Sequence, residues 1–168
     1  MKKIFTLLAF LCTIIGVAQN LMSPSEFLGY ELGTQFSRHH QVMDYYKYVS
    51  NTLANQVKLD TYGYTNERRP LVTAIISSAE NIKNLEAIRN AHLDNAKGSG
   101  NPDKAIVWLS YNVHGNESVS TEASMQTIYE LLTEKKGYLE NTVVIIDPCI
   151  NPDGRDRYVN WYNENKNT

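Results

Sequence analysis

The chain has 168 residues, a formal net charge of -2 and a hydrophobic content of 42%. This composition is that of one ordinary globular domain, and it excludes a disordered chain, because disorder goes with low hydrophobicity and high net charge. It also lacks a basic excess, so we expect no nucleic-acid partner.

The first 18 residues have the pattern of a secretory signal peptide. An apolar run over 4–17 follows Lys2 and Lys3, and small residues occupy the -3 and -1 positions of a cleavage site after Ala18. The run is shorter than the roughly 20 apolar residues of a spanning helix, so cleavage is favoured over anchoring. We therefore expect a secreted or periplasmic protein with no stable membrane anchor after cleavage. Its single remaining cysteine, Cys149, cannot form an internal disulfide and is interpreted as a buried apolar residue.

The next part of the chain is predicted to contain an arm, two helices and two strands. Residues 19–36 are expected to form an extended N-terminal arm, because small and polar residues surround Pro24. A helix fits 37–54, where one face is lined at spacings of four, three and four by Val42, Tyr46, Val49 and Leu53. Composition and periodicity further predict strands over 58–64 and 71–77, a helix over 81–95 and a loop over 97–102.

Two apolar runs in the second half of the chain predict buried strands. Residues 105–111 and 142–147 are nearly continuous in apolar side chains, which is typical of strands covered on both faces. A helix is expected between them over 119–134, so that strand, helix and strand form a crossover on one face of a sheet. The segment 151–154 is then expected to end the second strand in a tight turn, and the sequence beyond Tyr158 favours a loop.

A histidine and a glutamate three residues apart follow the first of these two strands. Zinc takes nitrogen, sulfur and carboxylate ligands, and a catalytic site holds it with three protein ligands and a water. His114 and Glu117 supply two ligands, and Gly115 lets the chain turn sharply so that they converge. Ligands bind at the carboxyl ends of strands in open α/β sheets, which is where this pair lies. Alone the pattern is weak, since a surface histidine beside a helix-capping glutamate also produces it.

Four segments in a fixed order make the pattern more specific. They are a segment ending in Glu67-Arg68-Arg69-Pro70-Leu71, the apolar strand ending in His114-Gly115-Asn116-Glu117, the helix after it, and Asn151-Pro152-Asp153-Gly154 after the next strand. In this order they resemble the M14-type zinc carboxypeptidase family, and the resemblance covers nearly all of the mature chain. Residues 23–33 also look like the first segment of a bacterial branch of these enzymes.

The resemblance implies a fold, a cofactor and site residues. The fold would be α/β, a mixed and mostly buried sheet with helices on both faces, incomplete at the C-terminus. Zn²⁺ would be the cofactor, with His114 and Glu117 as metal ligands. Arg69 would line the substrate groove, where its guanidinium can donate to a peptide carbonyl or carboxylate. A surface position or a structural salt bridge is the alternative for Arg69.

The arginines near these motifs depart from the family pattern in two places. The family usually has glycine where this chain has Arg68, and the change affects the loop that carries Arg69. Arg155 and Arg157 follow the Asn-Pro-Asp-Gly segment, and either could polarise the scissile carbonyl. The family's arginine for that role comes further along, so a structural role is favoured for both.

Several parts of the family's active site have no counterpart in this chain. The family mechanism needs a third zinc ligand, a histidine well downstream, as well as a general-base glutamate and an Asn-Arg pair for the terminal carboxylate. His39, His40 and His92 lie upstream, in or near predicted helices, and match no ligand position. We therefore expect no catalytic residue in this chain and a general base beyond Thr168.

The sequence thus predicts a signal peptide over 1–18, an arm over 19–36 and the N-terminal part of a carboxypeptidase-like catalytic domain over 37–168. In the complete protein, zinc would lower the pKa of a bound water, a glutamate would take its proton, and the hydroxide would attack a peptide carbonyl near a free C-terminus. The expected partner is a peptide or protein substrate, and this chain alone is expected to lack activity. Two alternatives stay open: a zinc-dependent deacylase or amidase of the same fold, or a non-catalytic peptidase-like binding module.

Overall fold

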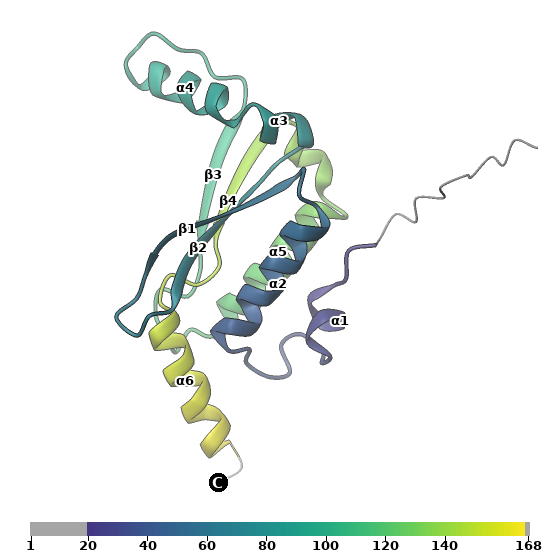
Figure 1. Cartoon of the computed structure of the whole chain (residues 1–168), viewed down its shortest axis with the longest axis vertical. Helices are drawn as coiled ribbons and strands as arrows, with labels where there is room; N and C mark the ends of the chain where they lie inside the picture. The colour runs from purple at the N-terminus through teal and green to yellow at the C-terminus, as the bar shows by residue number, and fades with distance from the viewer. Residues whose placement is uncertain (1–19, 167–168) are drawn as a thin grey trace, which may run out of the picture.

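The computed structural model describes residues 20–166, so the expected signal peptide lies outside the described residues. A four-stranded mixed sheet runs through the molecule in the order β1-β2-β4-β3 (Figure 1). β1 (Val57–Tyr64) pairs antiparallel with β2 (Pro70–Ile76), and β2 pairs antiparallel with β4 (Thr142–Asp147). β3 (Ala105–Ser110) pairs parallel with β4 across the crossover that the sequence predicts. The predicted α/β fold with a mixed sheet is confirmed.

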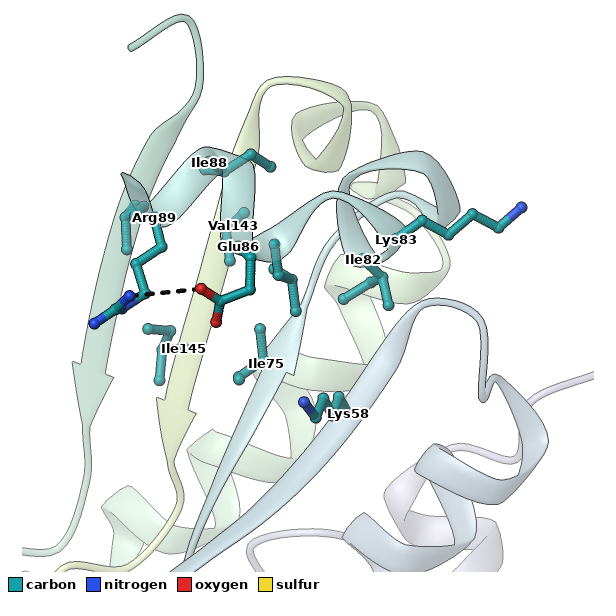
Figure 2. A pocket seen from close by; sticks show the side chains of 11 residues that line it. Lys58, Ile75, Ile82, Lys83, Glu86, Ile88, Arg89, Val143 and Ile145 are labelled. Carbon is teal, nitrogen blue, oxygen red and sulfur yellow. Dashed lines mark hydrogen bonds and ion pairs between the residues drawn. The ribbon is translucent and has the colours of Figure 1, made fainter. Parts of the chain in front are cut away.

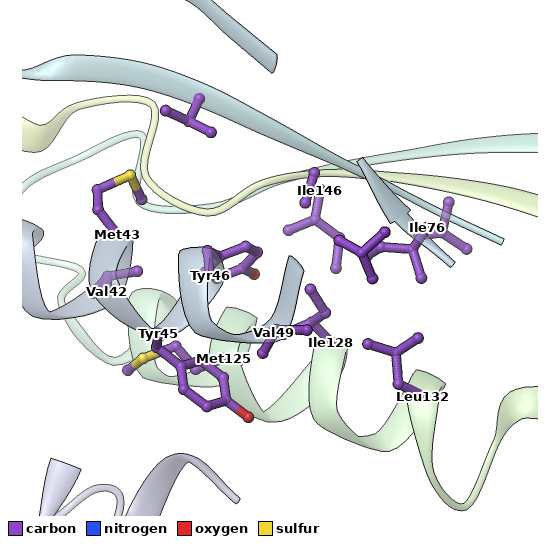
Figure 3. Close-up of a cluster of buried hydrophobic side chains, with 14 of the residues drawn as sticks. Val42, Met43, Tyr45, Tyr46, Val49, Ile76, Met125, Ile128, Leu132 and Ile146 are labelled. Carbon is purple, nitrogen blue, oxygen red and sulfur yellow. The ribbon is translucent and has the colours of Figure 1, made fainter. Parts of the chain in front are cut away.

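The main core lies between one face of the sheet and two helices, α2 (His39–Thr52) and α5 (Val119–Leu132). Figure 3 shows the helices side by side, with their apolar side chains directed at Ile76 and Ile146 of the sheet. The face predicted for α2 is confirmed, since Val42, Tyr46 and Val49 are fully buried. Each such side chain contributes about 1.5–3 kcal/mol by leaving water.

The opposite face of the sheet is covered at one end. There α3 (Ala79–Lys83) and α4 (Leu85–Ala96) stand over a hollow, with Ile88 and the sheet residues Ile75, Val143 and Ile145 around it (Figure 2). Beyond this end Trp108 is 63% exposed, and five of the six β3 residues are exposed. The prediction of burial on both faces is correct for most of β4 and wrong for β3. β3 is an edge strand of the sheet among residues 20–166, and the helices that cover the inner strands leave most of its side chains exposed.

Three predicted segments differ from the structure. The helix predicted over 81–95 is two helices, α3 and α4, which meet at Asn84. The arm contains a short helix, α1 (Pro24–Leu28), with Ser23 as its N-cap in a capping box with Glu26. The loop expected beyond Tyr158 is instead part of α6 (Pro152–Asn165), and a short 3-10 helix, η1 (Lys136–Glu140), precedes β4.

The α6 helix was not predicted, because the residues at its start also have the pattern of a tight turn. Asn151 and Pro152 stop a strand, but they are also a favourable N-cap and first helical residue. The side chain of Asn151 accepts a hydrogen bond from the backbone nitrogen of Gly154 at 3.0 Å. The helix then buries few apolar side chains, so it lacks a clear apolar stripe. No helix within residues 20–166 has the length and apolar character needed to cross a bilayer.

Candidate metal site

His114 and Glu117 lie together on the loop that leaves the carboxyl end of β3. The His114 Nδ1 and the Glu117 Oε2 are 3.1 Å apart, and the two side chains are 69% and 63% exposed. The backbone nitrogen of Glu117 donates to the carbonyl of His114 at 3.0 Å, which closes a turn between them. The structure therefore brings the two predicted ligands side by side and leaves both accessible to water.

Polar side chains hold the first part of this loop. Asn112 has a left-handed backbone (φ 56°), and its backbone nitrogen donates a hydrogen bond to Ser120 Oγ at 3.0 Å. Its side-chain oxygen accepts a hydrogen bond from Thr121 Oγ1, also at 3.0 Å. The loop thus turns away from β3 at Asn112 and is tied there to the first turn of α5.

The first turn of α6 forms the other support of the loop. Asn151 Nδ2 donates to the carbonyl of Val113 at 3.1 Å. Gly115 packs directly on Gly154, and a Cβ added to Gly115 would lie 2.7 Å from the Gly154 Cα. The segment expected to be a turn is therefore a helix start on which the His114–Glu117 loop rests.

Arg69 lies against the same turn of α6, where it is surrounded by acids. Its Nη1 contacts Glu67 Oε2 at 2.5 Å and Asp153 Oδ1 at 2.7 Å, and its Nε contacts Asp156 Oδ2 at 2.8 Å. Hydrogen bonding to Glu67, and then to the two aspartates, raises the pKa of Arg69. Two of its three guanidinium nitrogens are thus engaged by carboxylates.

The position of Arg68 explains the departure from the family pattern. Arg68 has φ 65°, the left-handed region that glycine adopts without a steric penalty. Its nitrogen donates to the carbonyl of Thr65 at 3.0 Å, which closes the β1–β2 turn. The turn therefore keeps the shape that glycine favours although arginine occupies the position.

The two arginines after the Asn-Pro-Asp-Gly segment have different surroundings. Arg155 is fully buried and bonded to Glu122 of α5. Arg157 is exposed and pairs with Glu67 Oε1 at 3.0 Å. Beside Arg157 a shallow groove runs between Gly115 and Asn116 of the loop and Tyr158 and Trp161 of α6. No local motif indicates the Arg155–Glu122 pair, because its members are 33 residues apart.

The remaining histidines and the cysteine lie elsewhere. His39 is buried, with Nε2 3.0 Å from the carbonyl of Pro70, and His92 Nε2 is 2.7 Å from the carbonyl of Lys104. Cys149 is buried, and burial raises its pKa to about 12, so it is a poor nucleophile.

The His114–Glu117 pair fits zinc as two of its ligands. Two ligands of a tetrahedral zinc with bonds of about 2.0–2.2 Å lie roughly 3.4 Å apart, close to the 3.1 Å observed. Imidazole nitrogen and carboxylate oxygen are both donors that zinc accepts. Within residues 20–166 no cluster of three or more His, Cys, Asp or Glu side chains could hold a metal ion. His114 and Glu117 are therefore two candidate ligands, fewer than the three that a catalytic zinc site needs.

The zinc carboxypeptidase family model matches residues 42–168, which is more than half of the chain. This chain belongs to the zinc carboxypeptidase family. The match includes Arg69, the His114–Glu117 loop and the start of α6, which confirms the resemblance seen in the sequence.

Solved structures of carboxypeptidases share the fold. A carboxypeptidase A from Helicoverpa armigera is similar with a TM-score of 0.60 and 21% identity, over 84% of this chain and 31% of that chain. Bovine thrombin-activatable fibrinolysis inhibitor, in complex with tick carboxypeptidase inhibitor, is similar with a TM-score of 0.53 and 17% identity, over 79% of this chain and 35% of that chain. A putative carboxypeptidase A from Shewanella denitrificans is similar with a TM-score of 0.51 and 19% identity, over 74% of this chain and 28% of that chain. The chain thus spans about a third or less of the length of these solved structures.

Proposed function

We propose that this chain carries one part of the zinc site of a secreted or periplasmic metallocarboxypeptidase, which hydrolyses a peptide or protein substrate near its free C-terminus. The observation that carries the proposal is the 3.1 Å approach of His114 Nδ1 to Glu117 Oε2 at the carboxyl end of β3. Membership of the family supports the reaction class. The third ligand and the general base would come from polypeptide other than residues 20–166.

In this proposal the loop supplies an imidazole nitrogen and a carboxylate oxygen to the metal. Zinc, when bound, makes water a nucleophile near neutral pH and polarises a carbonyl oxygen. His114 must be neutral at the bonding nitrogen, so metal binding weakens as the pH falls. Gly115 and Asn116, which lie between the two candidate ligands, line the groove beside Tyr158 and Trp161, so a substrate in this groove would lie next to the pair.

Arg69 has a structural role in this proposal and is also a candidate substrate contact. Its bonds to Glu67, Asp153 and Asp156 support the structural salt bridge that the sequence left as the alternative. The contacts with the three carboxylates use Nη1 and Nε, so a substrate carbonyl or carboxylate would be bound through Nη2. Arg69 therefore serves first to fix the β1–β2 turn against α6 and second as a candidate substrate contact.

The test of the metal site is zinc affinity, measured by competition with a chromogenic chelator on the mature chain. We expect weak binding by the wild type and at least tenfold weaker binding by His114→Ala. His40→Ala is the matched control, because His40 is exposed and lies on α2 rather than on the loop. Equal affinity of the wild type and His114→Ala would remove His114 from the metal site.

The test of the reaction class is release of C-terminal residues from a set of peptides and their acylated analogues. We expect no turnover by this chain alone, because two ligands activate water poorly. Turnover that disappears in His114→Ala would show a complete site and contradict the proposal of a partial one. Absence of zinc binding in every variant would favour the non-catalytic binding module.

A further inference from the structure

A buried ion pair lies directly beneath the candidate metal loop. Arg155 Nη2 is 2.5 Å from Glu122 Oε1, and the two side chains are 0% and 4% exposed. The Arg155 Nε also donates to the carbonyl of Ser37 at 3.0 Å, and the backbone nitrogen of Ser37 donates to Glu122 Oε1 at 2.6 Å. The guanidinium lies 5.5 Å from the ring centre of Phe36. Every partner is thus protein, and the pair is shielded from water.

The third contact of Arg155 reaches the loop itself. Its Nη1 donates to the carbonyl of Ser118, the residue that follows Glu117. Glu122 stands in the first turn of α5, and Arg155 stands in the first turn of α6. The pair therefore ties the end of the loop to both helices, while Asn151 holds its beginning through the carbonyl of Val113.

Stability alone does not account for such a pair. Replacing a buried ion pair by apolar side chains of similar volume is often neutral or stabilising. A metal ligand pair, in contrast, needs a fixed separation, and partners behind the ligands commonly change metal affinity by 10–100-fold. His114 and Glu117 are exposed, so their side chains receive little packing of their own and depend on the loop for their positions.

We propose that Arg155 and Glu122 are positioning residues that hold the His114–Glu117 loop in its metal-binding shape. The inference rests on the proposed function. It assigns Arg155 a place behind the metal ligands, where it acts through the carbonyl of Ser118 rather than on the substrate. The buried pair thus fixes the conformation of the loop in the metal-free protein.

Two readouts on the mature chain test the proposal. The first is zinc affinity, which should fall about tenfold or more in Arg155→Met and in Glu122→Gln. The second is metal-free amide hydrogen exchange by NMR, in which the amides of Glu117 and Ser118 should exchange faster in both variants than in the wild type. The second readout does not depend on zinc.

Two control variants separate positioning from a general loss of stability. Arg89→Met makes the same replacement at an exposed arginine on α4 and should change neither readout. Leu139→Ala removes a buried side chain of η1 in the main core and should lower stability without changing zinc affinity. A loss of affinity in Leu139→Ala equal to that in Arg155→Met would overturn the positioning role.

The outcomes distinguish this inference from the proposed function. If the wild type and His114→Ala bind zinc equally, the proposed function fails and the amide exchange of Glu117 and Ser118 decides the positioning role. If Arg155→Met does not fold, Glu122→Gln decides, because glutamine keeps the shape of Glu122 and an acceptor oxygen for Ser37 and Arg155 but removes the charge of the pair. Unchanged affinity together with unchanged exchange in a folded variant overturns the inference.

Discussion

Gly115 of the candidate metal loop packs against Gly154 in the first turn of α6. A Cβ on Gly115 would lie 2.7 Å from the Gly154 Cα and closer still to its carbonyl group. Two glycines far apart in the sequence therefore set how near the loop approaches the helix. This contact places the His114–Glu117 pair relative to α6 and to the groove beside it.

Gly115→Ala should destabilise the protein, because backbone atoms of Gly154 have to move to admit the methyl group. We expect a loss of about 1–3 kcal/mol in the free energy of unfolding, measured with urea. The matched control is Gly137→Ala, where a Cβ would meet nothing within 4 Å, and its effect should stay within about 0.5 kcal/mol. A Gly115→Ala protein as stable as the control would mean that the two glycines do not pack this closely.

Arg68→Gly should stabilise the protein. Arg68 holds a left-handed backbone at φ 65°, which costs a residue with a Cβ about 1–2 kcal/mol. Glycine removes this cost but loses more entropy on folding, so we expect a net gain of about 0.5–1 kcal/mol in urea unfolding. Arg68→Ala separates the effect of the backbone conformation from that of the charge. It removes the charge but keeps the Cβ, so it should not increase stability. A gain in alanine equal to that in glycine would contradict the backbone explanation.

Asp147→Asn should stabilise the protein at neutral pH but not in acid. Asp147 is buried, its Oδ1 has no hydrogen-bond partner among the described residues, and Tyr62 donates to Oδ2 at 2.5 Å. Burial raises the pKa of Asp147 above its usual 3.8, against the opposing effects of hydrogen bonds from Tyr62 and from the backbone of Cys149. The folded protein thus binds the proton more tightly than the unfolded chain, so wild-type stability falls as the pH rises from 3.8 through the raised pKa.

The increase in unfolding free energy caused by Asp147→Asn should therefore be small below pH 3.8. It should grow as the pH rises through the raised pKa and reach on the order of 1 kcal/mol at neutral pH. Urea unfolding at several pH values measures it. The control is Asp103→Asn, an exposed aspartate beside Lys104, whose difference from the wild type should vary little with pH. A gain from Asp147→Asn that is the same at all pH values would show that charge burial is not its cause.

Arg69→Met should destabilise the protein more at neutral pH than in acid. The Arg69 hydrogen bond lowers the pKa of Glu67. Burial acts to raise the pKa of Asp153, but hydrogen bonds from Thr65 and Arg69 outweigh it and lower that pKa. Carboxyls with lowered pKa values stabilise the fold above their usual values and lose this contribution as the pH falls through the folded values.

Removing Arg69 leaves three carboxylates facing one another at neutral pH, and this repulsion disappears when they are protonated. The measurement is the difference in unfolding free energy between Arg69→Met and the wild type at neutral pH and near pH 3. Arg38→Met is the control, because Arg38 is exposed and donates to the uncharged Asn160 side chain. A destabilisation by Arg69→Met that does not shrink in acid would contradict the electrostatic role.

The sequence predicted those parts of the fold that depend on local periodicity. Val42, Tyr46 and Val49 recur at helical spacing, so the buried face of α2 was identified correctly. α6 was not predicted, because Asn151 and Pro152 serve equally as a turn and as a helix start. The exposure of β3 was not predicted either, because the apolar composition of a strand does not reveal whether another segment covers it.

The candidate site was predictable only as far as a motif extends along the chain. His114 and Glu117 are three residues apart, and the structure places them in contact distance. The supports of their loop come from distant residues, such as Arg155 beneath Ser118 and Gly154 against Gly115. These contacts follow from how α5 and α6 pack, and no short motif encodes that packing.

The most direct test of the metal site is a zinc titration of residues 19–168, followed by the NMR signals of the histidine rings. The chain has four histidines, and we expect the ring signals of His114 to shift while those of His39, His40 and His92 stay in place. A shift at His39, His40 or His92 without one at His114, or no shift at any ring at millimolar zinc, would contradict the central claim that His114 and Glu117 form the metal site.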